Sequence, residues 1–391
     1  MKRCRRHLWL SLAFGICVVL QGCAGFPGLP GDGNQFRPIP STGGGGTPLA
    51  VNLDDRFQGH IAFVRNHQLY VLSGKDGTIR ALPAAGNNVQ DPAYAPDGSR
   101  LAYVSRGDAW SDLMIIPASG GAPVALTHNR GTGRQITCPG GVSETDSVWV
   151  ADPVWTPDGK TLYYLSDAQK LALSCGFLDM AIWKMPARGG APELVVWPAR
   201  GNGTGDPGAG GDADLSLRPG ADAALTYTHY AYDPQNSGER LIQIFLAALN
   251  QQRGVIQQEE TVLTPATGAD GTTPLQALQA SWSPDGHELA YIIQANGSES
   301  LVVMHVSDSA SGAPDFSDYA TSTRLLEGAI SYPIWSPDGK SLLYMDFKYN
   351  EFNLYLVQLA FNGTTVSVQA GPTQLTQGGV DGDSHPSWTS A

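Results

Sequence analysis

Short apolar runs recur along most of the chain, and many of them follow a turn of the same composition. The segment Trp335-Ser336-Pro337-Asp338-Gly339-Lys340 leads into the apolar run Ser341-Leu342-Leu343-Tyr344. Related segments begin at Tyr94, Trp155 and Trp282, and weaker copies occupy residues 217–220 and 385–389. Pro, Asp and Gly together favour a tight turn, and the apolar run after it is typical of a buried strand. This recurrence indicates a repeat architecture.

The apolar runs group into sets of four. Five sets are complete, and they begin at Asp91, Asp152, Asp214, Gln279 and Tyr332. The runs at 60–64, 68–72 and 78–82 lack a first member, whereas the run at 385–389 has no followers, so these two halves complement each other. We therefore predict an all-β fold, a six-bladed β-propeller of four-stranded antiparallel blades over residues 58–391. Strands from both ends of the chain would close it. In the set that begins at Tyr332, the fourth strand is expected at 373–376.

Composition narrows the class of function. The chain has 391 residues, of which 42% are hydrophobic, enough for a large core, and its 47 Gly and 27 Pro suit a protein with many turns. Only 15% of the residues are charged, and the formal net charge is −12. Nucleic-acid binding and an electrostatic hold on anionic lipid both need a basic surface, so neither is expected.

The N-terminus has the features of an export signal. A basic segment, Lys2-Arg3-Cys4-Arg5-Arg6, precedes an apolar run at 8–20, which is too short to span a bilayer as a mature helix. Leu20-Gln21-Gly22-Cys23 resembles the lipobox of bacterial lipoproteins, which implies a signal peptide at 1–22 and acylation of Cys23. An ordinary secretory signal with an unrelated cysteine is the alternative. Loss of the four basic residues would change the formal net charge from −12 to −16.

A Gly- and Pro-rich stretch follows the lipobox, so we expect residues 23–57 to form a flexible tether. The protein would then be exported and membrane-anchored through its lipid. Ala24 after the cysteine resembles sorting to the outer membrane in a cell with two membranes. In a cell with one membrane, the anchor would lie in the outer face of the cytoplasmic membrane.

The turn phrases resemble the TolB-type, or PD40, repeats of β-propellers, and with the lipobox they resemble a TolB-like lipoprotein. The resemblance covers residues 58–391 and implies the fold, but propellers carry many unrelated functions. The TolB protein has an α/β domain before its propeller. Here we expect lipobox, tether and propeller to follow one another directly, so a role in the Tol–Pal system is not carried over.

Two cysteines, Cys138 and Cys175, lie beyond the signal and the lipobox. An even pair in an exported protein favours a disulfide between them, with two free thiols as the alternative. The propeller topology places both in loops on the same face.

The first residues of the six sets are expected to form a ring at one mouth of the central channel. They are Asp91, Asp152, Asp214, Gln279, Tyr332 and His385, with Asp212, Asp381 and Asp383 nearby in sequence. Carboxylates around one opening could bind Ca²⁺, and Asp91, Asp152 and Asp214 are the candidates. The simpler interpretation is that each Asp bonds to its own loop at a loop–strand junction.

No motif of a known catalytic class stands out. The sequence has no Gly-x-Ser-x-Gly, no Cys-x-x-Cys and no phosphate-binding loop. We therefore expect a non-catalytic scaffold that binds a protein or a cell-envelope glycan on the face with long insertions, at 128–151, 167–180, 198–211, 230–240 and 265–278. The alternative is a channel-based polysaccharide lyase or hydrolase that uses the mouth carboxylates and His385.

The lipobox generates a direct test. Cys23→Ser removes the sulfur that would be acylated, so the full chain should move from the membrane fraction to the soluble fraction. Mass spectrometry of the mature N-terminus provides the second measurement. An unmodified N-terminal peptide that starts at another residue would contradict lipid anchoring.

Overall fold

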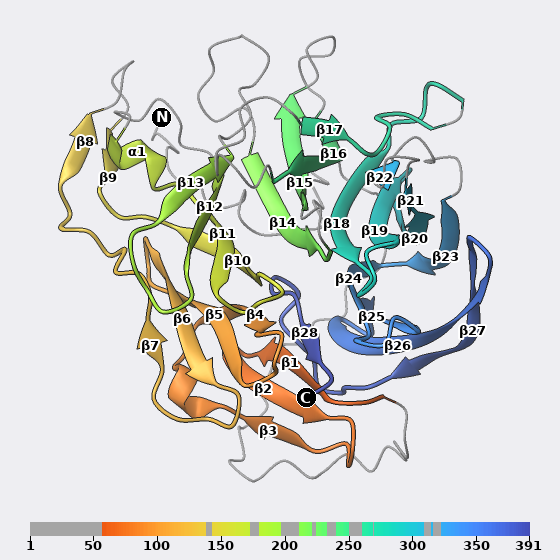
Figure 1. Ribbon diagram of the computed structural model, residues 1–391, viewed down its shortest axis with the longest axis horizontal. Coiled ribbons are helices and arrows are strands. Elements are labelled where there is room, and N and C mark those ends of the chain that lie inside the picture. The colour runs from red at the N-terminus through yellow and green to blue at the C-terminus, as the bar shows by residue number, and fades with distance from the viewer. Residues whose placement is uncertain are drawn as a thin grey trace, which may run out of the picture.

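The computed structural model is a ring of six four-stranded antiparallel sheets around a central axis (Figure 1). It describes residues 57–137, 143–172, 180–196, 211–220, 224–232, 240–249, 260–268, 270–308, 314–315 and 322–391. Each sheet is one blade, and in five blades the four strands follow one another along the chain, apart from a small hairpin inserted in one of them. The all-β, six-bladed propeller predicted from the repeats is confirmed.

The first three blades contain the N-terminal half of the propeller and one strand from the C-terminus. The strands of blade 1 are β28 (Ser387–Thr389), β1 (His60–Arg65), β2 (Gln68–Ser73) and β3 (Ile79–Ala81). Those of blade 2 are β4 (Val89–Tyr94), β5 (Arg100–Arg106), β6 (Ser111–Pro117) and β7 (Val124–Ala125). Those of blade 3 are β10 (Val150–Trp155), β11 (Thr161–Ser166), β12 (Ala181–Pro186) and β13 (Glu193–Val196).

The remaining blades continue in the same order. The strands of blade 4 are β14 (Gly211–Arg218), β15 (Ala224–Tyr232), β16 (Arg240–Ala248) and β17 (Glu260–Val262). Those of blade 5 are β18 (Gln276–Trp282), β19 (Glu288–Ala295), β20 (Ser298–His305) and β23 (Thr323–Gly328). Those of blade 6 are β24 (Ile330–Trp335), β25 (Ser341–Lys348), β26 (Glu351–Asn362) and β27 (Thr365–Gln374).

A few short elements lie between these strands. The segment expected as a long loop at 128–151 contains a hairpin of β8 (Gln135–Thr137) and β9 (Ser143–Thr145). A second hairpin, β21 (Ser307–Asp308) with β22 (Pro314–Asp315), belongs to the insertion in blade 5. The four-residue helix α1 (Gln169–Ala172) follows β11. The described part of the chain contains no helix long and apolar enough to span a lipid bilayer.

Both ends of the chain close the ring in blade 1, as predicted. Ile61 of β1 pairs with Trp388 of β28, in antiparallel register. The Trp388 indole N–H donates to the Gln58 carbonyl at 2.9 Å, and its ring contacts Phe57 edge-on, with ring centroids 5.5 Å apart. These contacts fix the C-terminal strand beside the N-terminal one, so the inner edge of β1 is paired.

The repeated turns are stabilised by their own side chains. Ser336 Oγ donates to Asp338 Oδ1 at 2.6 Å, and the Lys340 N–H donates to the same oxygen at 3.1 Å. The Thr156–Asp158 and Ser283–Asp285 turns have the same bonds. Because every bond is local, the Pro-Asp-Gly phrase is sufficient to specify the turn.

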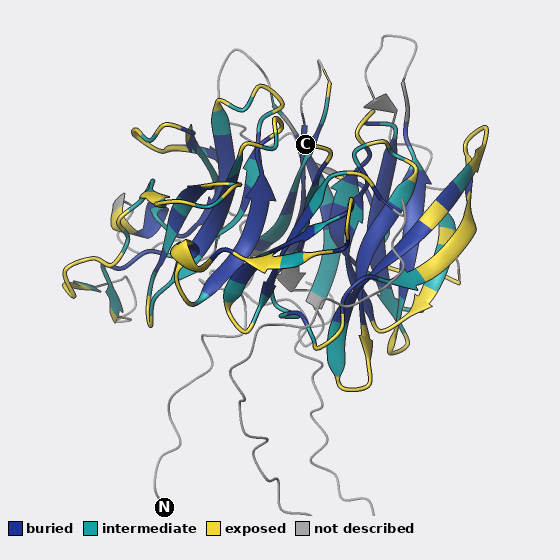
Figure 2. Cartoon of the chain, turned by 90° about the horizontal axis from the view of Figure 1, so that it is seen from below, coloured by how far each residue is buried: buried dark blue, intermediate teal, exposed yellow. Residues whose placement is uncertain are grey.

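The tryptophans of the repeat connect neighbouring blades. The Trp155 indole N–H donates to the Ala93 carbonyl of blade 2, and that of Trp335 to the Ser281 carbonyl of blade 5, both at 3.0 Å. The core lies between the faces of neighbouring blades, and Figure 2 shows buried residues along the strands. The side chains of a repeated tyrosine are fully buried in this core, at Tyr103, Tyr227, Tyr291 and Tyr344.

One strand differs from the sequence prediction. The last strand of blade 6 was expected at 373–376, but β27 spans Thr365–Gln374 and pairs with β26 across a two-residue turn. The strand continues across Gly371 and Pro372, which the structure accommodates through irregular register between Leu356 and Leu359 of β26. Among the described residues, β27 is the longest outer strand of the propeller.

The closure strand can be tested at Gly59. Its φ is +83°, and a Cβ there would lie 1.8 Å from the Thr389 carbonyl oxygen. Gly59→Ala should therefore cost about 1–3 kcal/mol of unfolding free energy beyond its backbone strain, because the added methyl displaces β28. Gly86→Ala is the matched control, since Gly86 has φ +92° with open space around it. Equal urea midpoints for the two variants would contradict the role given to β28.

Candidate functional site

The first strand of five blades bends at the same position. Asp91, Asp152, Asp214, Gln279 and Tyr332 all have φ between +47° and +58°. Each lies at a register irregularity between the first and second strands of its blade. Residues other than Gly rarely adopt a positive φ, and a Tyr in this region is a clear outlier. Five repeats of a strained conformation require surroundings that hold it in place.

The surroundings are the neighbouring blades. The Asp152 N–H donates to Asp91 Oδ2 at 3.5 Å, and the Asp214 N–H donates to Asp152 Oδ2 at 2.8 Å. The Tyr332 N–H donates to Gln279 Oε1 at 2.9 Å. In each pair the bent residue of one blade donates its backbone N–H to the side chain of the preceding bent residue.

Two hydroxyl groups complete this series. Thr228 Oγ1 donates to Asp214 Oδ2 at 2.8 Å and accepts from the Gln279 N–H at 3.0 Å, so it links blade 4 to blade 5. Ser384 Oγ accepts from the Asp91 N–H at 2.9 Å, which links the C-terminal segment to blade 2. Hydrogen bonds thus run between bent residues around most of the channel.

The structure brings the six predicted mouth residues into this ring, and we call Asp91, Asp152, Asp214, Gln279, Tyr332 and His385 the mouth ring. Ligand atoms of Asp91, Asp152 and His385 lie within 4.8 Å of one another, whereas Asp214 is outside this compact group. The rings of Tyr332 and His385 have centroids 6.2 Å apart. The compact group therefore differs from the three carboxylates considered for Ca²⁺.

The other acids near the mouth have different partners. Asp381 accepts the N–H groups of Asn66 and His67 at 2.8 and 2.7 Å, and so stabilises the β1–β2 turn. Asp383 accepts from Gln90 Nε2 at 2.8 Å. Asp212 Oδ1 lies 2.8 Å from His229 Nδ1 in a buried pair. Asp381 thus has a structural role, but it stabilises the β1–β2 turn and not its own loop, which was the simpler interpretation.

Burial strongly perturbs the carboxyl groups of the mouth ring. Burial, and then the charge of Asp152, raise the pKa of Asp91 well above its usual range. Burial also raises the pKa of Asp152, and the nearby His385 partly opposes this. The pKa of Asp214 is raised to about 7, by burial first and by the charge of Asp152 second. Near neutral pH the ring therefore retains protons unless a cation compensates its charge.

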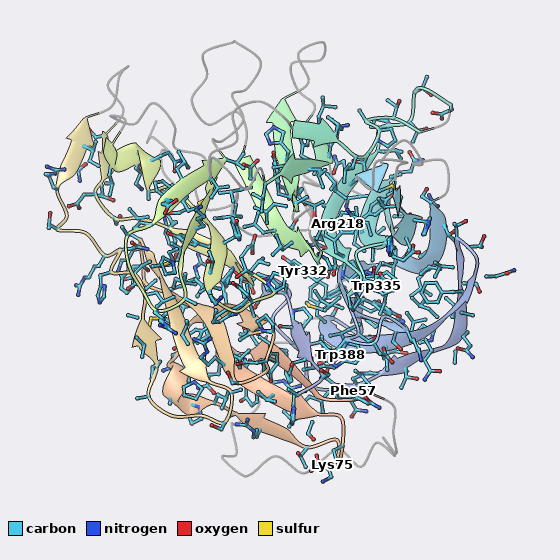
Figure 3. All side chains as sticks on the ribbon, in the orientation of Figure 1. Phe57, Lys75, Arg218, Tyr332, Trp335 and Trp388 are labelled. Atoms are coloured by element: carbon cyan, nitrogen blue, oxygen red, sulfur yellow. The ribbon has the colours of Figure 1, made fainter. Side chains whose placement is uncertain are left out.

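A cavity of about 290 Å³ lies along the channel next to the mouth ring, and Asp214, Gln279, Tyr332 and His385 line its inner end. Figure 3 shows Tyr332 near the centre of the propeller. The walls come from the first strands and include the prolines that follow bent or mouth residues, Pro92, Pro153, Pro333 and Pro386. The cavity extends to Pro96 and Pro157 of the Pro-Asp-Gly turns.

One polar atom at this cavity lacks a partner. The Gln279 side chain is buried, with 3% of its residue surface exposed, and its Oε1 accepts from Tyr332. Its Nε2 has no hydrogen-bond partner in the described structure. A buried amide donor normally has a hydrogen-bond acceptor. A ligand in the channel would therefore be stabilised if it placed an acceptor beside Gln279 Nε2.

Sequence reasoning missed several residues of the site. Thr228 lies on the second strand of blade 4, and Ser384 precedes the mouth position of the last repeat. Nothing in their local sequence marks them, because their partners lie in other blades. Cys23, Cys138 and Cys175 lie outside the described residues, so acylation and the disulfide stay predictions.

Comparison with known proteins places this geometry in context. No protein-family model matches the chain. The structure is similar to that of TolB from Acinetobacter baumannii, with a TM-score of 0.51 and 16% identity over 85% of this chain and 66% of that one. The fold is a TolB-like propeller. Identity at this level shows the fold alone.

Two curated relatives match in sequence. An uncharacterized peptidase of Bacillus subtilis is 34% identical over 88 residues, which are 21% of this chain and 11% of that protein. An uncharacterized protein of Agrobacterium fabrum is 23% identical over 228 residues, 57% of this chain and 61% of its own length. The chain thus spans less than two thirds of either relative, and neither match assigns a function to the TolB-like propeller.

The raised pKa of Asp214 predicts an unusual pH dependence of stability. The folded state prefers the protonated carboxyl, so this stabilising contribution is full below about pH 4 and is lost as the pH rises to about 7. Asp214→Asn does not titrate and should be more stable than the unsubstituted protein at pH 8, by urea unfolding. The difference in unfolding free energy between this variant and the unsubstituted protein should shrink as the pH falls towards 5.

Asp158→Asn is the contrasting control. Asp158 is exposed, and its hydrogen bond from Thr156 lowers its pKa, so its contribution is present at neutral pH and is lost in acid. This variant should be less stable than the unsubstituted protein at pH 8. If the two variants shift stability in the same direction at pH 8, the electrostatic account of Asp214 is wrong.

Proposed function

We propose that this protein is an exported, lipid-anchored scaffold that binds a protein or cell-envelope glycan partner through a cationic group held at the mouth ring. The observation that carries the proposal is the convergence of Asp91, Asp152 and His385, with Asp214 at the inner end of the channel cavity. Lipid anchoring rests on the sequence around Cys23.

Electrostatics favours a positively charged ligand. Removing the protons from the buried carboxyl group of Asp91 and the half-buried ones of Asp152 and Asp214 leaves like charges close together, and an incoming cation offsets that repulsion. A narrow opening in a protein with a formal net charge of −12 also concentrates the negative field. Binding a cation would release protons from the ring, so affinity should rise with pH through about 7.

The cavity supports a cationic group on a longer stem. Its walls carry prolines and other apolar residues, which suit the apolar part of a Lys side chain or an extended peptide. Gln279 Nε2 offers a donor to a carbonyl next to the cationic group. Because the cavity reaches Pro96 and Pro157, the partner would enter from the face of the Pro-Asp-Gly turns. The sequence had favoured the face with long insertions.

The chemistry of the compact group also indicates which metal ion it would suit. Ca²⁺ prefers a shell of six to eight oxygens, whereas two carboxylates and an imidazole suit a transition metal better. The set Asp91, Asp152 and His385 therefore fits Ca²⁺ less well than the three carboxylates suggested by the sequence. An ammonium group needs only acceptors at hydrogen-bond distance, which the carboxylates supply.

Calorimetry with a Lys-containing neutral-capped peptide, Ca²⁺ and Mn²⁺ separates these ligands. We expect the peptide to bind, more tightly at pH 8 than at pH 6. Asp152→Asn should weaken it at least about tenfold, because a close charge pair is lost. Asp108→Asn changes the net charge equally at an exposed position that is not part of the mouth ring, in the loop between β5 and β6, and should have no comparable effect.

The alternative activities give distinct outcomes. Binding of a metal ion alone, abolished by Asp152→Asn, would replace the cationic-group proposal with a metal site. Turnover of a polysaccharide, abolished by His385→Ala, would replace the scaffold with a lyase or hydrolase. Absence of binding by the peptide and both metals would show that the mouth ring only stabilises the fold.

A further inference from the structure

The outer strand of blade 6 differs from the outer strands of the other five blades. Those strands, β3, β7, β13, β17 and β23, contain two to six residues each. Four of them carry a charged side chain, namely Arg80, Glu193, Glu260 or the Arg324–Glu327 pair, and β7 has only two residues. Short length and charge are the usual protections of a sheet edge.

β27 is long and uncharged, and its pairing with β26 is regular from Thr365 to Val368 and irregular beyond it. It contains ten residues, and the whole segment 352–380 lacks Asp, Glu, Lys, Arg and His. Every position from 367 to 372 is exposed. Val368 is 36% exposed, and Phe361 of the paired strand β26 is 44% exposed. Figure 2 shows the exposed surface of this hairpin at the edge of the molecule, where Figure 1 places β27.

The open edge of β27 can accept another strand. In the described structure β27 pairs with β26 alone. An edge strand presents unpaired N–H and C=O groups at alternate residues, and a second extended chain can satisfy them. Pro372 limits this edge near its C-terminal end, which leaves Thr365–Gly371 as the accessible part.

We propose that two copies of this chain associate through β27, edge to edge and antiparallel. Charge selects a second copy as the occupant. Two chains that each carry a formal net charge of −12 repel each other, and they can approach most closely where both surfaces are uncharged. The segment 352–380 provides such a surface on each chain.

The strand is also compatible with its own copy. Val368 is the last residue of β27 before the irregularity at Gln369. An antiparallel pairing centred on Val368 would place it opposite Val368 of the second copy, and Ser367 opposite Gln369 on either side. Val366 and Thr365 would face Ala370 and Gly371. Every pair joins uncharged residues, and β-branched residues such as Val366 and Val368 favour strand pairing. The two blades would form one continuous sheet around a two-fold axis, which is the commonest symmetry of protein dimers.

Sedimentation of the full chain in detergent tests the association. We expect a dimer whose dissociation constant rises at least about tenfold in Val368→Lys, because two ammonium groups would face each other on the axis. Val262→Lys is the matched control, since Val262 is a 48% exposed valine on the outer strand of blade 4. It should leave the dimer unchanged.

Cross-linking tests the register. Facing residues of an antiparallel pair have Cα atoms about 4.5–5.5 Å apart, which suits a disulfide. Val368→Cys should therefore form a covalent dimer on mild oxidation, seen on a non-reducing gel against the unsubstituted chain. Thr365→Cys is the control. Residue 365 of one copy and residue 365 of the other would lie six residues apart along the paired strands, a distance of about 20 Å, so they should not cross-link.

Three results overturn the proposal. One is a chain that stays monomeric up to about 100 µM, where even a weak specific contact is populated. Another is a dimer that Val368→Lys and Val262→Lys affect equally. The third is a dimer in which Thr365→Cys cross-links and Val368→Cys does not. If the edge of β27 instead binds an extended peptide of another protein, the chain itself stays monomeric, which is the first of these three results.

Discussion

The left-handed residue in the first strand of five of the six blades is the constraint on which the centre of the propeller depends. A regular strand would alternate its side chains between the two faces of the blade. The positive φ at Asp91, Asp152 and Asp214 interrupts the pairing with the second strand and frees the backbone N–H. That N–H then bonds to the preceding blade, so the same distortion builds the mouth ring and joins the blades.

This arrangement explains why acidic side chains occupy several of these positions. Asp tolerates positive φ better than most residues, and its carboxylate can accept the N–H of the next blade. Each of the three carboxyl groups accepts a hydrogen bond, from Asp152, Asp214 or Thr228, and burial raises the pKa of each. Three acids with raised pKa values around one channel are the feature on which the proposed cationic ligand rests.

Local signals in the sequence were sufficient to predict the fold. The Pro-Asp-Gly turn is stabilised by bonds within five residues, so its copies marked the start of each second strand, and counting back from the Trp located the mouth residues. The bonds that define the site join residues some sixty positions apart, as from Asp214 to Asp152, and no local pattern reports them. Thr228 and Ser384 were missed for that reason. The start of β27 was also missed, because only the pairing with β26 shows that the strand begins at Thr365.

Closure of blade 1 by the C-terminal strand has a mechanical consequence. A load applied through the residues that precede Phe57 enters the propeller where Gln58 bonds to Trp388 and His60 lies beside Thr389. A force along β1 would slide this strand past both β2 and β28, so many hydrogen bonds would have to break together rather than one after another. The entry point of the chain is therefore also the place where the propeller is well suited to resist tension.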